Sequence, residues 1–150
     1  MVEAAWHTGD PGLLFLDRIN RANPTPHLGP IEATNPCGEI PLLLHESCNL
    51  GSINLAHMLD KQRDQPTVDR GKRRATTRTA VRFLDDVIEV NKYPRAEIER
   101  LSRGNRKMGL GVMGFADMLI QLGMSYDSDA AVEQARDLMG VIAEEARLTS

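Results

Sequence analysis

The sequence has few aromatic residues, no long apolar run and no excess of positive charge. Its 150 residues include six aromatic side chains and carry a formal net charge of −3. Proteins that bind nucleic acid or an anionic membrane surface usually present a basic patch, and those that bind single strands stack bases on aromatic rings. No stretch approaches the roughly 18 apolar residues that span a bilayer. The composition therefore argues against nucleic acid and membranes as partners.

Cysteine is also scarce, because Cys37 and Cys48 are the two cysteines of the whole chain. The first residues lack the basic and apolar regions of a signal peptide, so we expect a reducing, cytoplasmic location and two thiols or a redox pair. Structural zinc sites need about four ligands at close spacing. Here ten residues separate the cysteines and the four histidines are scattered, so we expect no metal site.

The rest of the composition is typical of one folded domain, with 41% apolar and 26% charged residues. Turn signals crowd residues 1–36, and the apolar runs after each cysteine predict short strands. A polar, mixed-charge stretch predicts a solvated connector over residues 60–75. Helical patterns follow it, so mixed α/β structure with a mainly helical C-terminal half is expected.

Three helical patterns in the C-terminal half carry specific predictions. The first has an apolar stripe at helical spacing, made of Ala80, Phe83, Leu84, Val87, Ile88 and Val90. The second is a short helix that is expected to end at Gly104. The third begins at an N-cap, Asp127 or Ser128, and its pattern still continues at the last residue. We therefore expect the chain to be part of a longer one.

The stretch GLGVMG, residues 109–114, matches the glycine pattern of dinucleotide-binding proteins. That fingerprint requires an apolar strand that runs into the glycine turn. The residues before the match, SRGNRKM, are instead polar and basic. We therefore interpret the glycines as positions that let a strand and the following helix pack closely.

The stretch NPCGE, residues 35–39, surrounds the first cysteine with groups suited to chemistry on a small molecule. Its proline and glycine predict a stiff turn that cannot continue a helix. Asn35 and Glu39 flank Cys37 at two positions on either side, and residues two apart on an extended or looped backbone point the same way. An amide, a thiol and a carboxylate would then meet one ligand, and Cys48 would approach from a neighbouring segment. A role as small buried hydrophobes is the usual one for a pair of cysteines, but it does not account for these neighbours of Cys37. A cysteine nucleophile would also need a histidine, and no local signature supports one.

Five segments in this order resemble the catalytic subunit of ribonucleotide reductase, and the proline and glycine of NPCGE resemble its adenosylcobalamin-dependent (class II) branch. Leu44 and His45 differ from the proline and aromatic residue that the family usually has there. The five segments are AWHTGDPGLLFLDRINRANPTP, ATNPCGEIPLL, ESCNLGSINLA, AVRFLDDVIEVNKYP and NRKMGLGVMGFADMLIQLG.

The resemblance implies a role for each residue of the predicted site. Cys37 is expected to become a thiyl radical that removes the 3′-hydrogen of the ribose. Glu39 is expected to act as the general base on the 3′-hydroxyl. Asn35 is expected to hydrogen-bond the sugar hydroxyls. Cys48 is expected to be one half of the dithiol that reduces the sugar and ends as a disulfide.

The resemblance also implies a fold and several missing parts. The family fold is a ten-stranded α/β barrel with the thiyl cysteine on a central loop, so residues 1–150 would be a partial, central piece with that loop at 33–40. The full enzyme would supply the N- and C-terminal parts, adenosylcobalamin, the second cysteine of the dithiol and contact with a thioredoxin-like reductant. We expect ribonucleotides as the substrate and no reductase activity from the chain alone.

Two other functions remain as alternatives at this stage. A cytosolic thiol redox protein would use Cys37 and Cys48 as a disulfide switch, and replacing either cysteine would have the same effect. An interaction domain would use NPCGE as a tight turn, and Asn35 or Glu39 would then be replaceable without loss of chemistry.

Overall fold

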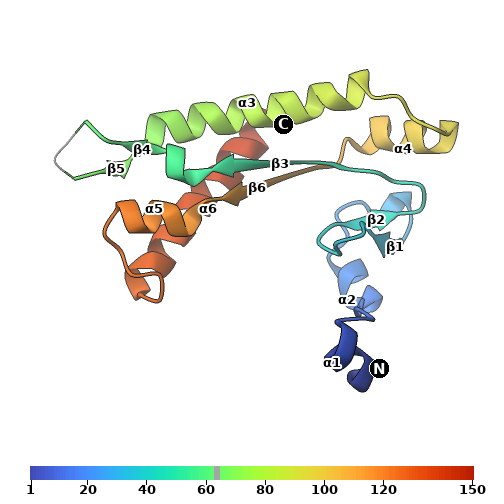
Figure 1. The fold of residues 1–150 in the computed structure, drawn as a ribbon. Helices are drawn as coiled ribbons and strands as arrows, with labels where there is room; N and C mark the ends of the chain where they lie inside the picture. Colours follow the sequence, from blue (N-terminus) through green and yellow to red (C-terminus); the bar gives the residue numbers. More distant parts are fainter. Residues whose placement is uncertain (63–64) are drawn as a thin grey trace. The chain divides into compact units, whose positions relative to one another are not determined.

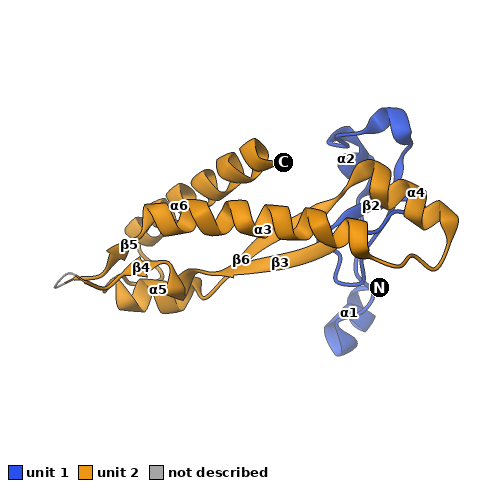
Figure 2. Ribbon diagram, turned by 90° about the horizontal axis from the view of Figure 1, so that it is seen from above, with its two compact units in different colours: residues 1–47 blue, residues 48–150 orange. Residues whose placement is uncertain are grey.

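The computed structural model describes residues 1–62 and 65–150, which form two compact units, Met1–Ser47 and Cys48–Ser150 (Figure 2). Both helices and strands are present and the C-terminal half is mainly helical, as predicted. In the described part of the chain the strands form three two-stranded sheets and no closed barrel. No helix among these residues is long and apolar enough to span a membrane.

The first unit is built around one short antiparallel hairpin. Its strands pair Ile31 with Leu43 and Thr34 with Pro41, with a register shift after Ile31. The elements are α1 (Val2–Thr8), α2 (Leu16–Arg21), the 3-10 turn η1 (Pro26–Leu28), β1 (Ile31–Thr34) and β2 (Pro41–Leu43). This hairpin carries the NPCGE stretch between its two strands.

The second unit contains a parallel strand pair joined by a helical crossover. Strand β3 pairs in parallel with β6 in register from Asn49–Met108 to Asn54–Met113, and α3 runs along both strands (Figure 1). The elements are β3 (Asn49–Asn54), η2 (Leu55–His57), β4 (Leu59–Asp60), β5 (Thr67–Val68), α3 (Arg70–Val90), α4 (Ala96–Asn105), β6 (Met108–Met113), α5 (Phe115–Gln121) and α6 (Asp129–Thr149).

The core of the second unit lies where the end of β3 meets α5 and α6. Its fully or nearly buried members are Ile53, Leu55, Met58, Leu59, Met118, Leu138 and Ile142. Side chains alternate along a strand, so the residues of β3 and β6 that face α3 share one side of the sheet. The other side carries Leu50 and Met113, each 53% exposed. Within the described residues of the second unit, one face of this parallel sheet is therefore largely exposed.

The predicted stripe of α3 is partly wrong. Leu84 and Ile88 are buried, but Phe83 is 65% exposed and Val90 is 77% exposed. The buried face instead continues through Val81 and Thr77. Residues 80, 83, 87 and 90 have the same helical spacing as 77, 81, 84 and 88, so the pattern alone does not separate the two stripes.

The helix boundaries follow the sequence signals at one end and depart from them at another. Ser128 is the N-cap of α6, and its hydroxyl oxygen accepts a hydrogen bond from the backbone N–H of Ala131 at 3.1 Å. Gly104, however, lies inside α4, and Arg106 takes the left-handed cap with φ of 49°. The Arg106 guanidinium binds the carboxylates of Asp85 and Glu89 on α3, which explains the later end.

The stretch predicted as a polar connector contains local structure at both ends. Strands β4 and β5 pair across it, and α3 already begins at Arg70 with Asp69 as its N-cap. Residues 63 and 64 of the connector lie outside the described residues.

Glu145 joins α6 to α3. Glu145 is 6% exposed to solvent. Its carboxylate accepts hydrogen bonds from the guanidinium groups of Arg74 (3.0 Å) and Arg78 (2.5 Å). The hydrogen bond from Arg78 lowers the pKa of Glu145 below its ordinary value of 4.5. The pKa of this carboxyl is thus lower in the folded chain than in the unfolded chain. Its ion pairs therefore contribute fully to stability at pH values above the unfolded-state pKa, and the contribution is lost as the pH falls through the folded-state pKa.

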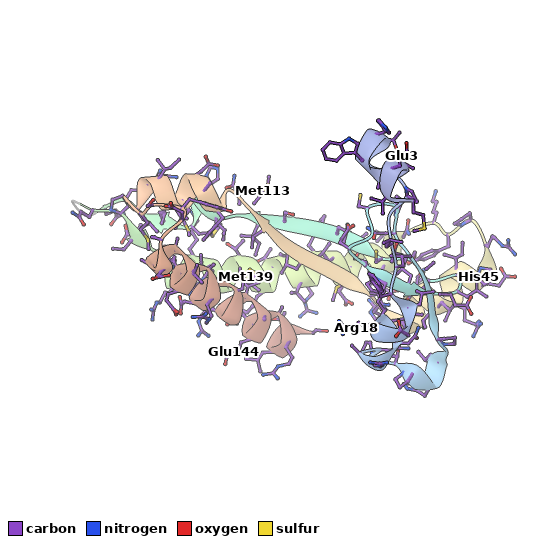
Figure 3. All side chains as sticks on the ribbon, turned by 90° about the horizontal axis from the view of Figure 1, so that it is seen from below. Glu3, Arg18, His45, Met113, Met139 and Glu144 are labelled. Carbon is purple, nitrogen blue, oxygen red and sulfur yellow. The ribbon has the colours of Figure 1, made fainter. Side chains whose placement is uncertain are left out.

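We expect Glu145→Gln to lower the urea midpoint of the chain at about pH 7, and the deficit to shrink as the solution is acidified through the carboxyl range. Glu144→Gln is the matched control, because Glu144 is an exposed neighbour on the same helix (Figure 3). The control should keep the wild-type midpoint throughout. A Glu145→Gln deficit that stayed constant in acid would contradict this account of the interaction.

Candidate active site

The NPCGE stretch forms the tip of the β1–β2 hairpin, and residues 35–40 between the strands are called the cysteine loop below. The loop begins with a turn in which the N–H of Gly38 donates to the carbonyl of Asn35 at 3.0 Å. Asparagine first, proline second and glycine fourth are the preferred residues of a type I turn. Gly38 has φ of +85°, a region that glycine enters without steric cost. Cys37 therefore occupies the third position of a locally encoded turn.

Asn35 closes the neck of the cysteine loop. Its backbone N–H donates to the carbonyl of Ile40 at 3.1 Å, and its side-chain Oδ1 accepts from the N–H of Ile40 at 3.0 Å. Within the described residues, no acceptor is bonded to its Nδ2. The oxygen of this amide thus maintains the loop, and the nitrogen is the group left to donate to a ligand.

Cys37 and Glu39 are both exposed on the cysteine loop, and Cys37 is a free thiol. The reading of Cys37 as a small buried hydrophobe is therefore wrong. Because residues 35–38 form a turn, the alternation of an extended strand does not decide which way the three side chains point. Their convergence on one ligand stays a prediction.

Cys48 belongs to the second unit, where it directly precedes β3. Its side chain is half-buried. Its approach to Cys37 stays a prediction. The structure thus groups Asn35, Cys37 and Glu39 on one loop and leaves Cys48 at the start of a separate unit.

The glycine-rich match at 109–114 does not form a dinucleotide-binding turn. Gly109 and Gly111 lie within strand β6, paired with Leu50 and Ser52, rather than in a turn after the strand. Gly114 has φ of +68° and is the N-cap of α5. The interpretation of these glycines as packing positions agrees with this placement.

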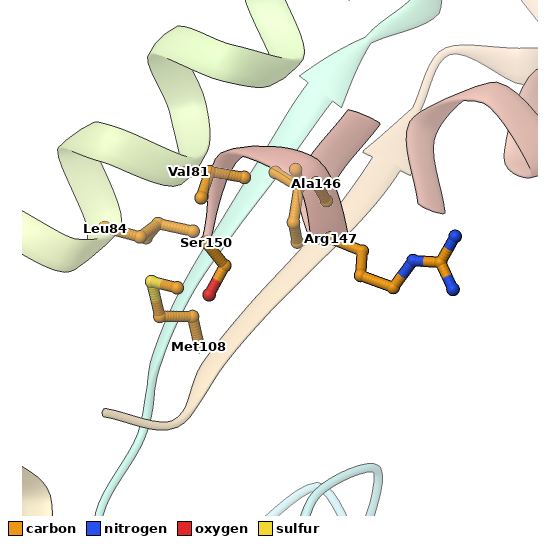
Figure 4. A pocket seen from close by; sticks show the side chains of 7 residues that line it. Val81, Leu84, Met108, Ala146, Arg147 and Ser150 are labelled. Atoms are coloured by element: carbon orange, nitrogen blue, oxygen red, sulfur yellow. The ribbon is translucent and has the colours of Figure 1, made fainter. Parts of the chain in front are cut away.

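A hollow of about 270 Å³ between α3, β6 and the end of α6 offers little recognition chemistry (Figure 4). Val81, Leu84 and Met108 line it, and the guanidinium of Arg147 points away from it. Ligand sites combine an apolar lining with a few convergent polar groups. This hollow is therefore not the candidate active site.

Sequence reasoning missed the two side chains that hold the base of the hairpin, Asn20 and Glu46. Asn20 lies in α2 and is bonded to β1, whereas Glu46 follows β2 and is bonded to it. The only local signal for Asn20 was an asparagine within a helical segment, where its side chain tends to seek backbone partners.

Comparison with known proteins shows which family and which relatives this sequence is similar to. The family model described as "Ribonucleotide reductase, barrel domain" matches residues 1–150. A vitamin B12-dependent ribonucleoside-diphosphate reductase of Thermoplasma acidophilum is 52% identical over 100% of this chain and 19% of its own length. One from Mycobacterium tuberculosis is 56% identical over 99% of this chain and 20% of its length. A ribonucleoside-diphosphate reductase subunit alpha of Chlamydia pneumoniae is 38% identical over 100% and 14%. The chain spans about a fifth of the length of the B12-dependent relatives.

Proposed function

The chain belongs to the ribonucleotide reductase barrel family, and from this membership we propose that it forms part of an enzyme that reduces ribonucleoside diphosphates to 2′-deoxyribonucleotides. The observation that carries the proposal is the exposed free thiol of Cys37 on a turn between an amide and a carboxylate. A disulfide switch gives no reason for Asn35 and Glu39 to flank that thiol. The reductase reaction uses both.

In the proposed reaction a thiyl radical on Cys37 takes the 3′-hydrogen of the ribose, so that the S–H bond forms as the C–H bond breaks. Glu39 accepts the proton of the 3′-hydroxyl, which is general-base work at hydrogen-bond distance, while the 2′-hydroxyl takes a proton from one of the two reducing thiols and leaves as water. The exposure of Glu39 suits this role, because no described residue forms an ion pair with its carboxylate.

The hydrogen bonds of Asn35 suggest which of its atoms would meet the substrate. Its Oδ1 already accepts from Ile40, so Nδ2 would donate to a hydroxyl oxygen of the sugar. A side chain already held by a hydrogen bond from the backbone of Ile40 loses little further freedom when a ligand binds. Asn35 would thus orient the sugar over Cys37.

Two thiols must supply the electrons for each reduced sugar, because loss of the 2′-hydroxyl as water and formation of a C–H bond require two electrons and two protons. The balanced reaction converts one ribonucleotide and two thiols into one deoxyribonucleotide, one disulfide and water. Cys48 would be one of these thiols. Its partner, and a thioredoxin-like protein that reduces the disulfide again, would come from outside this chain.

The exposed face of the β3–β6 sheet supports a larger barrel. Parallel sheets in proteins are almost always covered on both faces, yet this face exposes Leu50 and Met113. The sheet also has two strands, and the described residues pair with neither of its outer edges. We propose that β3 and β6 are neighbouring strands of a ten-stranded barrel that the remaining parts of the reductase complete.

Adenosylcobalamin is the cofactor that we propose for the complete enzyme, as the source of the unpaired electron. Nothing among the described residues identifies a site for it. The apolar hollow beside Met108, of about 270 Å³, is smaller than a corrin ring with its side chains. Its contacts would therefore lie in other parts of the reductase.

The proposal is tested with a chimeric enzyme in which this chain replaces the matching 150 residues of the Thermoplasma relative. With adenosylcobalamin, a ribonucleoside diphosphate and dithiothreitol, the chimera is expected to form deoxyribonucleotide, whereas the isolated chain is expected to stay at background. Glu39→Gln should lower kcat of the chimera by about 10²- to 10⁴-fold, the usual contribution of a general base.

Glu32→Gln is the matched control, since Glu32 is an exposed glutamate on β1, outside the cysteine loop. It should keep the activity of the unsubstituted chimera. Failure of the chimera to reduce any ribonucleotide, or equal activity of the Glu39 and Glu32 variants, would contradict the proposed function. Turnover by the isolated chain would contradict its dependence on the missing parts.

A further inference from the structure

Asn20 binds the base of the hairpin from outside the cysteine loop. Its Oδ1 accepts a hydrogen bond from the backbone N–H of Ile31 at 2.7 Å, and its Nδ2 donates to the carbonyl of Ile31 at 2.9 Å. The same Nδ2 donates to the carbonyl of Leu16 within α2 at 2.8 Å. The amide oxygen and both amide hydrogens are therefore used. If the amide were flipped, its nitrogen would face the N–H of Ile31 and its oxygen would face the two carbonyl oxygens, so all three hydrogen bonds would be lost.

This contact imitates a neighbouring strand. Both backbone groups of one residue are paired with one partner, as they are in the hydrogen-bonded pairs of an antiparallel sheet. The residue opposite Ile31 in the hairpin, Leu43, is held in the same manner on the other strand. Its N–H donates to Oε2 of Glu46 at 2.8 Å and its carbonyl accepts from the N–H of Glu46 at 3.1 Å.

The hairpin has few other constraints. In the described residues of the first unit, the buried side chains are those of Ile31, Leu43 and Glu46. The strands have four and three residues, and the register shifts between Ile31 and Ala33. Isolated two-stranded hairpins of this kind are marginally stable in water. The orientation of β1, and with it the position of the cysteine loop, therefore depends strongly on the polar contacts that Asn20 and Glu46 make at the base of the hairpin.

We propose that Asn20 is a positioning residue for the reaction, because its amide fixes the start of β1 and, through β1, the place of the Cys37 thiol. The inference rests on the proposed function, since a thiol needs placement only if it must meet one atom of a substrate. Asn20 itself touches no substrate. A misplacement of about 1 Å at a reacting group costs about 100-fold in rate.

Asn23 provides a matched control a few residues further on. Its Oδ1 accepts from the N–H of Thr25 at 2.9 Å and its Nδ2 donates to the carbonyl of Gly29 at 3.0 Å. It thus makes the same two kinds of bond as Asn20, but to the connection before β1 and not to β1 itself. Replacing Asn23 removes hydrogen bonds of the same two kinds and leaves the bonds to Ile31 in place.

The first experiment measures amide hydrogen exchange in the isolated 150-residue chain. Asn20→Ala should reduce the protection of the Ile31 amide by about tenfold, since it removes the oxygen that accepts from this N–H. The isosteric Asn20→Asp keeps that oxygen and loses the bonds to the carbonyls of Ile31 and Leu16, so its Ile31 amide should stay protected and Asn20→Ala is the deciding variant for exchange. Asn23→Ala should leave Ile31 protected, and amides of α6 should stay protected in all three variants. Unchanged protection at Ile31 in Asn20→Ala, or loss of protection throughout α6, would overturn the proposal, the latter by showing a general effect on folding.

The second experiment places the same variants in the chimeric reductase. Asn20→Ala and Asn20→Asp should lower kcat by about 100-fold and leave KM for the nucleotide near its original value, because the thiol moves and the binding groups stay. Asn23→Ala should keep both constants. Suppose that the unsubstituted chimera is active. If the Asn20 variants then keep its kcat, or if their KM rises as their kcat falls, the positioning role of Asn20 is contradicted and the proposed function stands. If the unsubstituted chimera is inactive, the proposed function fails and positioning fails with it.

Discussion

Replacing Cys37 by serine is expected to abolish both hydrogen abstraction and nucleotide reduction in the chimeric reductase. A hydroxyl of the same shape holds its hydrogen too strongly to exchange it with a ribose carbon, so no substrate radical forms. Removal of the residue that reacts directly with the substrate costs enzymes about 10⁴- to 10⁶-fold. The measurement is the washout of tritium from the 3′ position of the nucleotide, alongside deoxyribonucleotide formation.

Cys48→Ser should affect these two measurements, tritium washout and deoxyribonucleotide formation, differently. Under the proposed mechanism Cys48 delivers electrons after the 3′-hydrogen has left, so tritium washout should continue while reduction falls to background. Cys37 and Cys48 would behave alike if they formed only a disulfide switch. Equal loss of washout in both variants, or reduction that survives without Cys37, would therefore reject the radical role of Cys37.

Gly114→Ala is expected to destabilise the second unit by about 2–3 kcal/mol. Its φ of +68° is unfavourable for a residue with a Cβ, at about 1–2 kcal/mol. A Cβ at this position would also lie 2.5 Å from Oδ1 of Asn54. That oxygen accepts a hydrogen bond from the N–H of Ala56 at 3.1 Å as the cap of η2, and loss of a cap costs about 1 kcal/mol more. Urea unfolding followed by circular dichroism measures the sum.

Two further variants make this prediction specific. Gly140→Ala is the matched control, because Gly140 lies inside α6 with open space around its Cβ direction, and it should stabilise by about 0.5–1 kcal/mol. In an Asn54→Ala background the clash is gone, so Gly114→Ala should cost less than it does alone. A neutral Gly114→Ala, or a cost unaffected by Asn54→Ala, would show that the close contact is not what requires glycine.

The cysteine loop was predictable because its shape is encoded locally. An asparagine, a proline and a glycine around Cys37 predict a turn through their own backbone preferences, and the structure has that turn. The side chain of Asn35 was harder to predict. Its oxygen is bonded to Ile40, five residues later, and a pattern of residue types does not reveal which atom of an amide is already used.

The buried face of α3 shows what spacing leaves undetermined. Phe83 and Leu84 are adjacent, equally apolar for this purpose, and each belongs to a stripe at helical spacing. Leu84 is buried because it packs beside Gly51 on β3, where the missing side chain leaves room. The end of α4 was mispredicted for a similar reason, since Arg106 is held by carboxylates on α3 that are distant in the sequence.

The sequence by itself determined the turn that carries Cys37, the mainly helical character of the C-terminal half and the family, because these follow from residue type, local backbone preference and the succession of motifs. The tertiary structure alone decided which helix stripe is buried and that Asn20 holds Ile31. It also decided that Gly114 must lack a side chain. These depend on contacts between residues far apart along the chain, where the space left by one segment selects the group that fits from another.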